Sequence, residues 1–154
     1  MNYLGNTKEL SDKYKNNYPF PHIVLENSWS EDELNQVADE IENLPLDIWY
    51  KHKDPTSNEM VVQKKKMALN NPSMFEGRAP TTEKIMSYMT SPEILDWLSK
   101  LTGIENLIPD PYNLGGGVHR TTTGGKLSVH ADFNIHPKTK LHRRINVLLY
   151  LNRN

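Results

Sequence analysis

Apolar and polar positions divide the chain into a helical first part and a strand-like last part. Residues 22–25 are apolar and β-branched and follow a Pro-rich turn, so they predict an early strand. Ser30 and Glu33 have the S-x-x-E spacing of a capping box, and apolar residues then recur at helical spacing until Pro45. The pattern therefore predicts a helix over residues 30–44 with one buried face.

Two further helices are predicted before residue 104. Residues 82–89 read as one helix, and Ser91 and Pro92 suit the N-cap and the first position of the next. The apolar residues after Pro92 recur every three to four positions, which gives this helix a buried face. Gly103 suits the left-handed position that follows a last helical turn.

Residues 46–80 are polar and irregular, with several Pro, Gly and Asn turn signals. A weak strand is predicted at 60–63 or at 67–69. A connection of this length is usually functional, so it is interpreted either as a cover for a site or as a partner-binding segment. The lysine run 64–66 within it is interpreted as a solvated face rather than as an anion site.

The last third of the chain is strand-like. Strands are predicted over residues 118–122, 126–133 and 143–151, separated by turn signals at 124–125 and at 136–138. Because helices come first and strands after, the fold class predicted is α+β, with helices packed on one face of an antiparallel sheet.

At 154 residues the chain has the length of one domain, in which residues 18–103 are expected to form helical support and residues 112–154 the first core strands. The charge is −1, from 18 Lys and Arg against 19 Asp and Glu, so nucleic acid is not expected as a partner. The absence of Cys excludes disulfides and thiolate metal sites and fits a reducing, cytoplasmic compartment. No apolar run approaches the ~18 residues that a membrane span needs.

The candidate chemistry lies in the triplet formed by His130, Ala131 and Asp132. In a strand, alternation projects the side chains of His130 and Asp132 from the same face, roughly 7 Å apart at the backbone. One more His would complete a 2-His-1-carboxylate triad, which leaves coordination positions open on Fe(II). The alternative is a surface His beside a turn-forming Asp, and the triplet alone does not exclude it.

Three longer segments surround this triplet, namely Gly115–Arg120, Gly124–Asn134 and Arg143–Asn152. Together they resemble the prolyl-hydroxylase-like Fe(II)- and 2-oxoglutarate-dependent oxygenases. The segment Tyr18–Val24 also looks like the strand that usually opens these domains. The resemblance is specific over Tyr112–Asn152 and loose before it.

The resemblance implies a double-stranded β-helix, a jelly-roll core, with the helices packed on its major sheet. It implies that His130 and Asp132 are the first two metal ligands. Tyr150 matches a tyrosine that contacts 2-oxoglutarate in related ribosomal prolyl hydroxylases, and Leu127 matches a leucine of the same pocket. Asn146 is predicted to bind the cosubstrate only because strand alternation puts it on the face of Tyr150.

The sequence departs from the family pattern downstream. Members place a distal His and then an Arg or Lys well beyond a strand equivalent to residues 143–151, whereas this sequence ends at Asn154. His136 and His142 fall in a connection, and His119 and Arg120 fall one strand earlier, so none of them is predicted as a ligand. A partial sequence is expected, with an incomplete core, weak iron affinity and little turnover of this chain alone.

For the complete enzyme, the resemblance implies oxidative decarboxylation of 2-oxoglutarate coupled through O₂ to hydroxylation of a C–H bond. A prolyl or other peptide side chain is the leading substrate, and a small molecule is the alternative. Two interpretations from other classes stay open. One is a non-catalytic, cupin-like jelly-roll binding module, and the other is an interaction protein that engages a partner through residues 46–80.

Overall fold

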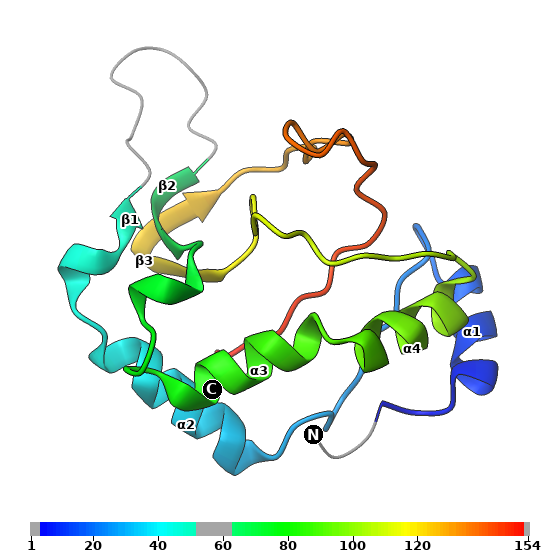
Figure 1. Cartoon of the computed structure of the whole chain (residues 1–154), viewed down its shortest axis with the longest axis horizontal. Helices are drawn as coiled ribbons and strands as arrows, with labels where there is room; N and C mark the ends of the chain where they lie inside the picture. The colour runs from blue at the N-terminus through cyan, green and yellow to red at the C-terminus, as the bar shows by residue number, and fades with distance from the viewer. Residues whose placement is uncertain (1–3, 52–62, 153–154) are drawn as a thin grey trace. The chain divides into compact units, whose positions relative to one another are not determined.

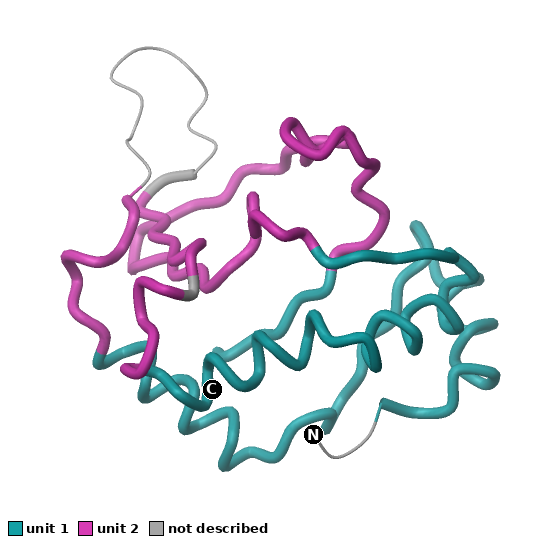
Figure 2. The backbone as a smooth tube through the Cα atoms, in the orientation of Figure 1, with its two compact units in different colours: residues 1–43, 79–109, 147–154 teal, residues 44–78, 110–146 magenta. Residues whose placement is uncertain are grey.

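The structure is a computed structural model that describes residues 4–51 and 63–152. These residues form four α-helices and a three-stranded antiparallel sheet (Figure 1), which confirms the predicted α+β class. The chain divides into two compact units (Figure 2). Unit 1 comprises residues 1–43, 79–109 and 147–154, and unit 2 comprises residues 44–78 and 110–146. The prediction of one domain stays a prediction, because compact units need not fold separately.

Unit 1 contains the four helices, of which three were predicted. They are α1 (Thr7–Asn16), α2 (Glu31–Asn43), α3 (Pro80–Met89) and α4 (Pro92–Thr102). Helix α1 contacts α4, and α2 contacts α3. The unpredicted helix, α1, is mostly polar and has no buried residue, and its apolar side chains are too few to reveal a helix in a sequence.

Local capping explains where α2 begins and where α4 begins and ends. The Ser30 backbone N–H and hydroxyl both donate to the Glu33 carboxylate, while the Glu33 N–H donates to the Ser30 hydroxyl, so the predicted capping box forms. These hydrogen bonds from Ser30 hold the pKa of Glu33 below its ordinary value. The Ser91 hydroxyl accepts the N–H of Ile94, and Gly103 closes α4 in the left-handed conformation.

The apolar side chains of unit 1 gather between its helices, as periodicity predicts. The buried residues of the unit are Val37, Ala38, Ile41, Ala79, Thr82, Ile85, Ile94 and Leu101. The indole N–H of Trp97, on α4, donates to the Gly5 carbonyl at 3.0 Å, which connects the residues before α1 to the helices.

Unit 2 contains the sheet, whose strands are β1 (Tyr50–Lys51), β2 (Gln63–Leu69) and β3 (Val118–Leu127) in the order β1-β2-β3. The ladder between β2 and β3 pairs Leu69 with Val118. Short 3₁₀ turns occupy Leu46–Ile48 and Pro72–Met74. The buried apolar residues of unit 2 are Leu44, Trp49, Met67, Ala68, Leu69 and Phe75.

Residues 46–80 are more regular than predicted. The strand expected at 67–69 is confirmed as the end of β2, whereas residues 60–62 of the alternative position lie outside the described residues. The polar residues at the start of β2 made the strand hard to predict, because a lysine run has the composition of a solvated loop. Pairing with β3 stabilises it in spite of that composition.

The predicted turn at Gly124–Gly125 is wrong, since β3 runs through it without interruption. Gly124 has φ +75°, Lys65 opposite has φ +52°, and the ladder shifts its register between Lys64 and Lys66. Glycine inside a strand often marks such a bulge rather than a turn. The strand predicted over 126–133 ends at Leu127 instead.

Two other predicted strands do not form among the described residues, namely 22–25 and 143–151. An apolar, β-branched run marks the first segment and alternation marks the second, but a strand also needs a neighbouring chain segment to complete its hydrogen bonds. The exposure of the side chains keeps the alternation in part, since Leu148 and Tyr150 are 68% and 77% exposed and Leu149 is half-buried, but Val147 is exposed too. Three strands are too few to establish a double-stranded β-helix.

Candidate functional site

An irregular hairpin positions the candidate site in unit 2. Ile135 and His142 form an isolated antiparallel bridge, and the Arg143 N–H donates to the Asn134 carbonyl at 2.8 Å. Lys140 turns the chain with φ +62°. The hairpin therefore brings residues 143–146 back beside the segment that carries His130 and Asp132.

The ring of His130 is oriented by its own backbone. Its Nδ1 lies 2.7 Å from the Ser128 carbonyl oxygen, which can only accept, so Nδ1 carries the proton of this bond. In the neutral imidazole, Nε2 is then left with a free lone pair. A hydrogen bond from the other ring nitrogen to a carbonyl is the usual way in which a metal-binding His is oriented.

His130 and Asp132 do lie together, as predicted. His130 Nε2 is 3.6 Å from Asp132 Oδ1, and the two side chains are 31% and 45% exposed. Two donors that share an ion at roughly 2.1 Å each lie about 3.0–3.4 Å apart, so this pair is a few tenths of an ångström wider. The pair has the donor types and nearly the spacing of half a metal site.

The second oxygen of Asp132 contacts two side chains that follow the hairpin. Arg143 Nη2 lies 3.2 Å from Asp132 Oδ2, and Asn146 Nδ2 donates to the same oxygen at 3.4 Å. The Arg143 guanidinium also donates to Asn146 Oδ1. Asn146 was predicted to bind a cosubstrate, and the structure shows it beside Asp132 instead of on a paired strand.

The other predicted site residues are exposed. Leu127 ends β3 and is 52% exposed, and Tyr150 belongs to unit 1. His119 lies on β3 opposite Ala68. Unit 1 contains an open pocket of about 490 Å³. The residues that line it all come from the segment 4–28, so none of the predicted site residues lines it.

His136 makes contacts that hold the local structure. It is 7% exposed, and its Nδ1 accepts the N–H groups of Lys138 and Thr139 at 3.1 Å each. Its Nε2 lies 3.2 Å from Asp110 Oδ1, and its ring stacks on Tyr112 with centroids 5.7 Å apart. His136 therefore holds the turn of the hairpin.

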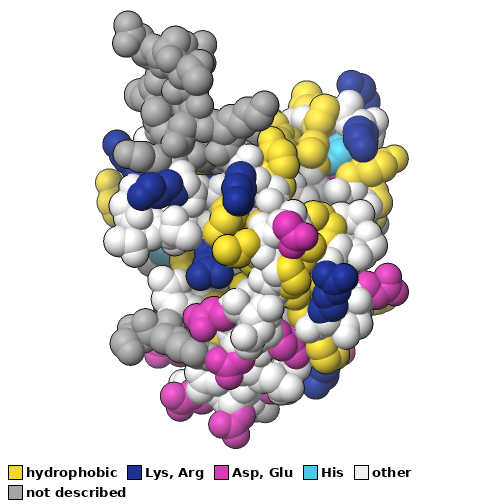
Figure 3. Space-filling model, turned by 90° about the vertical axis from the view of Figure 1, so that its left-hand side faces the viewer, with side chains coloured by type: hydrophobic (Ala, Val, Ile, Leu, Met, Phe, Trp, Pro, Cys, Tyr) yellow, Lys and Arg dark blue, Asp and Glu magenta, His cyan; other side chains and the backbone are white. Residues whose placement is uncertain are grey.

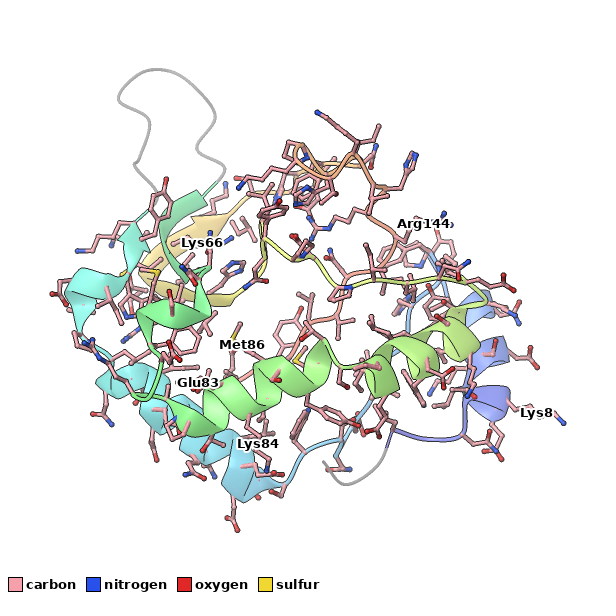
Figure 4. The ribbon with its side chains drawn as sticks, viewed as in Figure 1. Lys8, Lys66, Glu83, Lys84, Met86 and Arg144 are labelled. Carbon is pink, nitrogen blue, oxygen red and sulfur yellow. The ribbon has the colours of Figure 1, made fainter. Side chains whose placement is uncertain are left out.

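Lys66 is a residue near Asp132 that the sequence did not indicate. It was interpreted with its neighbours as a solvated face, but Lys66 (labelled in Figure 4) is half-buried whereas Lys65 is exposed, and the register of the ladder shifts between Lys64 and Lys66. Burial lowers the pKa of Lys66, and attraction to Asp132 opposes this effect. Ala68, two positions further along β2 and on the same face, is buried as well, so the apolar residue at 68 was the available signal.

The small net charge conceals an uneven distribution. Unit 2 has 12 Lys and Arg against 6 Asp and Glu, a charge of +6, and unit 1 has 6 against 13, a charge of −7. Figure 3 shows many of the cationic side chains at the surface in dark blue. The unit that carries His130 and Asp132 is thus cationic and attracts anions. The expected absence of a nucleic-acid partner rested on the whole-chain charge, and it stays a prediction.

Within residues 4–51 and 63–152, no three His, Asp or Glu side chains gather closely enough to hold a metal ion. No helix in this described part is long and apolar enough to cross a membrane. Comparisons of the chain with protein-family models, with curated proteins and with solved structures found no match.

Proposed function

We propose that this chain is part of an Fe(II)- and 2-oxoglutarate-dependent oxygenase in which His130 and Asp132 are two of the protein ligands. The observation that carries the proposal is the pair of atoms 3.6 Å apart, His130 Nε2 and Asp132 Oδ1. Because Nδ1 already donates to Ser128, both facing atoms of the neutral form are acceptors. Two facing acceptors need a cation or a proton between them.

The donor set fits iron. Imidazole nitrogen and carboxylate oxygen are the donors of the 2-His-1-carboxylate triad, and no thiolate is available in this chain to favour a softer ion. The positive charge of unit 2 also suits a dianionic cosubstrate such as 2-oxoglutarate. The double-stranded β-helix that the family resemblance implies is proposed as the complete fold.

When bound, Fe(II), O₂ and 2-oxoglutarate supply the oxidising chemistry for hydroxylation of a C–H bond. In this proposal, His130 and Asp132 hold the metal, and Ser128 fixes the ring of His130. The resemblance assigns contacts with the cosubstrate to Tyr150 and Leu127. A peptide, with a prolyl side chain foremost, is the proposed substrate.

A second candidate is a non-catalytic jelly-roll binding module. It is favoured by the contacts of Asp132 with Arg143 and Asn146, which give the carboxylate partners without any metal. A protonated His130 would then pair with Asp132 as a simple ion pair. The two candidates differ in whether the pair binds a divalent cation.

Anaerobic addition of Fe(II) and then 2-oxoglutarate to the full-length protein tests the proposal. A visible metal-to-ligand charge-transfer band is expected, absent in His130→Ala and retained in His142→Ala. His142 is a suitable control because it lies in the same hairpin and is exposed. A wild-type protein that shows no band and binds no Fe(II) would refute the oxygenase and leave the binding module.

A further inference from the structure

The Arg143 guanidinium packs against the Phe133 ring and Gly115 in unit 2. It lies over the Phe133 ring, 5.1 Å from the centroid, and its side chain is 24% exposed. Gly115 lies beside it, where an added Cβ would be 3.8 Å from Arg143 Nη1 and 3.6 Å from the Phe133 ring. An added Cβ would make ordinary contact with both groups, and a side chain at this position would strain the backbone, where φ is +78°.

The contacts of Arg143 converge on one oxygen of Asp132. Nη2 reaches Asp132 Oδ2 and also Asn146 Oδ1, while Asn146 Nδ2 donates to Oδ2. The three side chains form a closed set of contacts that leaves Oδ1 to face His130. The planar, rigid donor arrangement of guanidinium suits a position that must contact two acceptors at once.

Stability alone does not account for this arrangement. Ion pairs between partly exposed groups contribute little to stability, since water and salt screen them. Orientation is the larger consequence, because a free carboxylate can rotate or bind an ion through both oxygens. With Oδ2 held, Asp132 offers only Oδ1 on the side of His130.

We infer that Arg143 is a positioning residue for the metal site, which reserves Oδ1 of Asp132 for the ion by holding Oδ2. The inference rests on the proposed function. Asn146 assists by bonding to both partners. Outer contacts of this kind typically change metal affinity by about 10- to 100-fold when they are removed.

The positive charge of Arg143 acts in the opposite direction, since it repels a divalent ion. A test must therefore change the geometry and keep the charge. Arg143→Lys does so, because an ammonium cannot reproduce the planar donor arrangement, and Asn146→Ala removes a neutral partner. Arg144→Lys is the matched control, since Arg144 is the exposed next residue (Figure 4).

Lys66→Met is the control for charge, because Lys66 interacts with Asp132 electrostatically. Co(II) is the probe, titrated into the full chain and followed by its visible absorption. Arg143→Lys and Asn146→Ala are expected to weaken Co(II) binding about tenfold. Arg144→Lys should stay within twofold of the wild type, and Lys66→Met should bind equally or more tightly.

A second measurement reports whether the Asp132 carboxylate binds Co(II) through one oxygen or through both. If Oδ2 is released, Asp132 can bind through both oxygens, so the Co(II) band should lose intensity as the coordination number rises. Near-UV circular dichroism of each variant checks the fold, and Asn146→Ala carries the test if Arg143→Lys is misfolded.

The outcomes separate the inference from the proposed function. Less than threefold weakening in Arg143→Lys and in Asn146→Ala, in a protein that binds Co(II), would overturn the inference alone. Equal weakening in Arg144→Lys would overturn it too, because the effect would then not be specific to Asp132. A wild-type chain that binds no Co(II) would overturn both.

Discussion

The carboxylate of Glu40 accepts two hydrogen bonds from Thr82, one from the backbone N–H and one from the hydroxyl, each 2.8 Å long. It also accepts the N–H of Thr81 at 2.9 Å. Residue 79, at the N-cap of α3, makes no side-chain cap. A side chain of α2 therefore caps α3, and the negative charge lies favourably at a helix N-terminus.

Glu40→Gln should destabilise the protein by about 1–2 kcal/mol at neutral pH, because a charged acceptor is lost at a helix start. Burial alone would raise the pKa of Glu40, but the hydrogen bonds from Thr82 and Thr81 prevail and lower it. A lowered folded-state pKa means that this stability is present above the ordinary value of 4.5 and is lost as pH falls through the folded pKa.

Urea unfolding at several pH values measures this effect. The difference between Glu40→Gln and the wild type should shrink in acid. Glu105→Gln, at an exposed position after α4, is the control for loss of one negative charge. A difference that is constant from neutral to acid pH would contradict a role for the ionised carboxylate.

Gly117→Ala should destabilise unit 2 strongly. Gly117 has φ +104°, and an added Cβ would lie 2.2 Å from the backbone oxygen of Leu69, which is fully buried. Strain and displacement of the β2 backbone together should cost about 3 kcal/mol. Gly77→Ala is the matched control, because its φ is +72° but its Cβ would meet nothing within 4 Å, so about 1 kcal/mol is expected. Equal thermal shifts for both variants would show that the close approach to Leu69 is unimportant.

His136→Phe should loosen the hairpin that carries Arg143. The phenyl ring preserves the packing on Tyr112 but cannot accept the N–H groups of Lys138 and Thr139. The free energy of unfolding is expected to fall by about 1 kcal/mol, and hydrogen exchange at these two amides should be faster. His136→Asn keeps a hydrogen-bond acceptor, so the amides of Lys138 and Thr139 should retain more protection from exchange than in His136→Phe. Unchanged exchange in both variants would refute the capping role.

Lys66→Met should raise the free energy of unfolding by a few tenths to about 1 kcal/mol, since it removes a half-buried ammonium that keeps part of its hydration. The folded-state pKa of Lys66 is lowered, so the cost of its charge is present in full at neutral pH and disappears as pH rises through that pKa. The advantage of Lys66→Met in urea unfolding should therefore shrink in alkali. Lys65→Met, at an exposed position, should show no such advantage.

The helices were largely predictable because their signals are local. The Ser30–Glu33 box and the Ser91 and Gly103 caps act within one or two turns, so the sequence contains both partners of each contact. Helix α1 was missed because it has too few apolar residues to form a clear helical pattern. The cap of α3 was beyond prediction, since Glu40 and Thr82 are 42 positions apart.

The strands were harder, because a strand exists only where another chain segment completes its hydrogen bonds. Alternation indicated residues 67–69 and 118–122 correctly and 143–151 equally clearly, yet only the first two lie in the described sheet. The glycines at 124 and 125 have the composition of a turn, and pairing with β2 made them part of a bulged strand.

At the candidate site, the sequence by itself determined which donors can hold a metal and that His130 and Asp132 stand two residues apart. Their chemistry and spacing are properties of a short segment. Only the tertiary structure decided that Arg143 and Asn146 contact one oxygen of Asp132 and that Lys66 is close enough to interact with Asp132 electrostatically. Those contacts depend on the hairpin turn and on the bulge of β2, where distant backbone hydrogen bonds, rather than local preference, set the direction of each side chain.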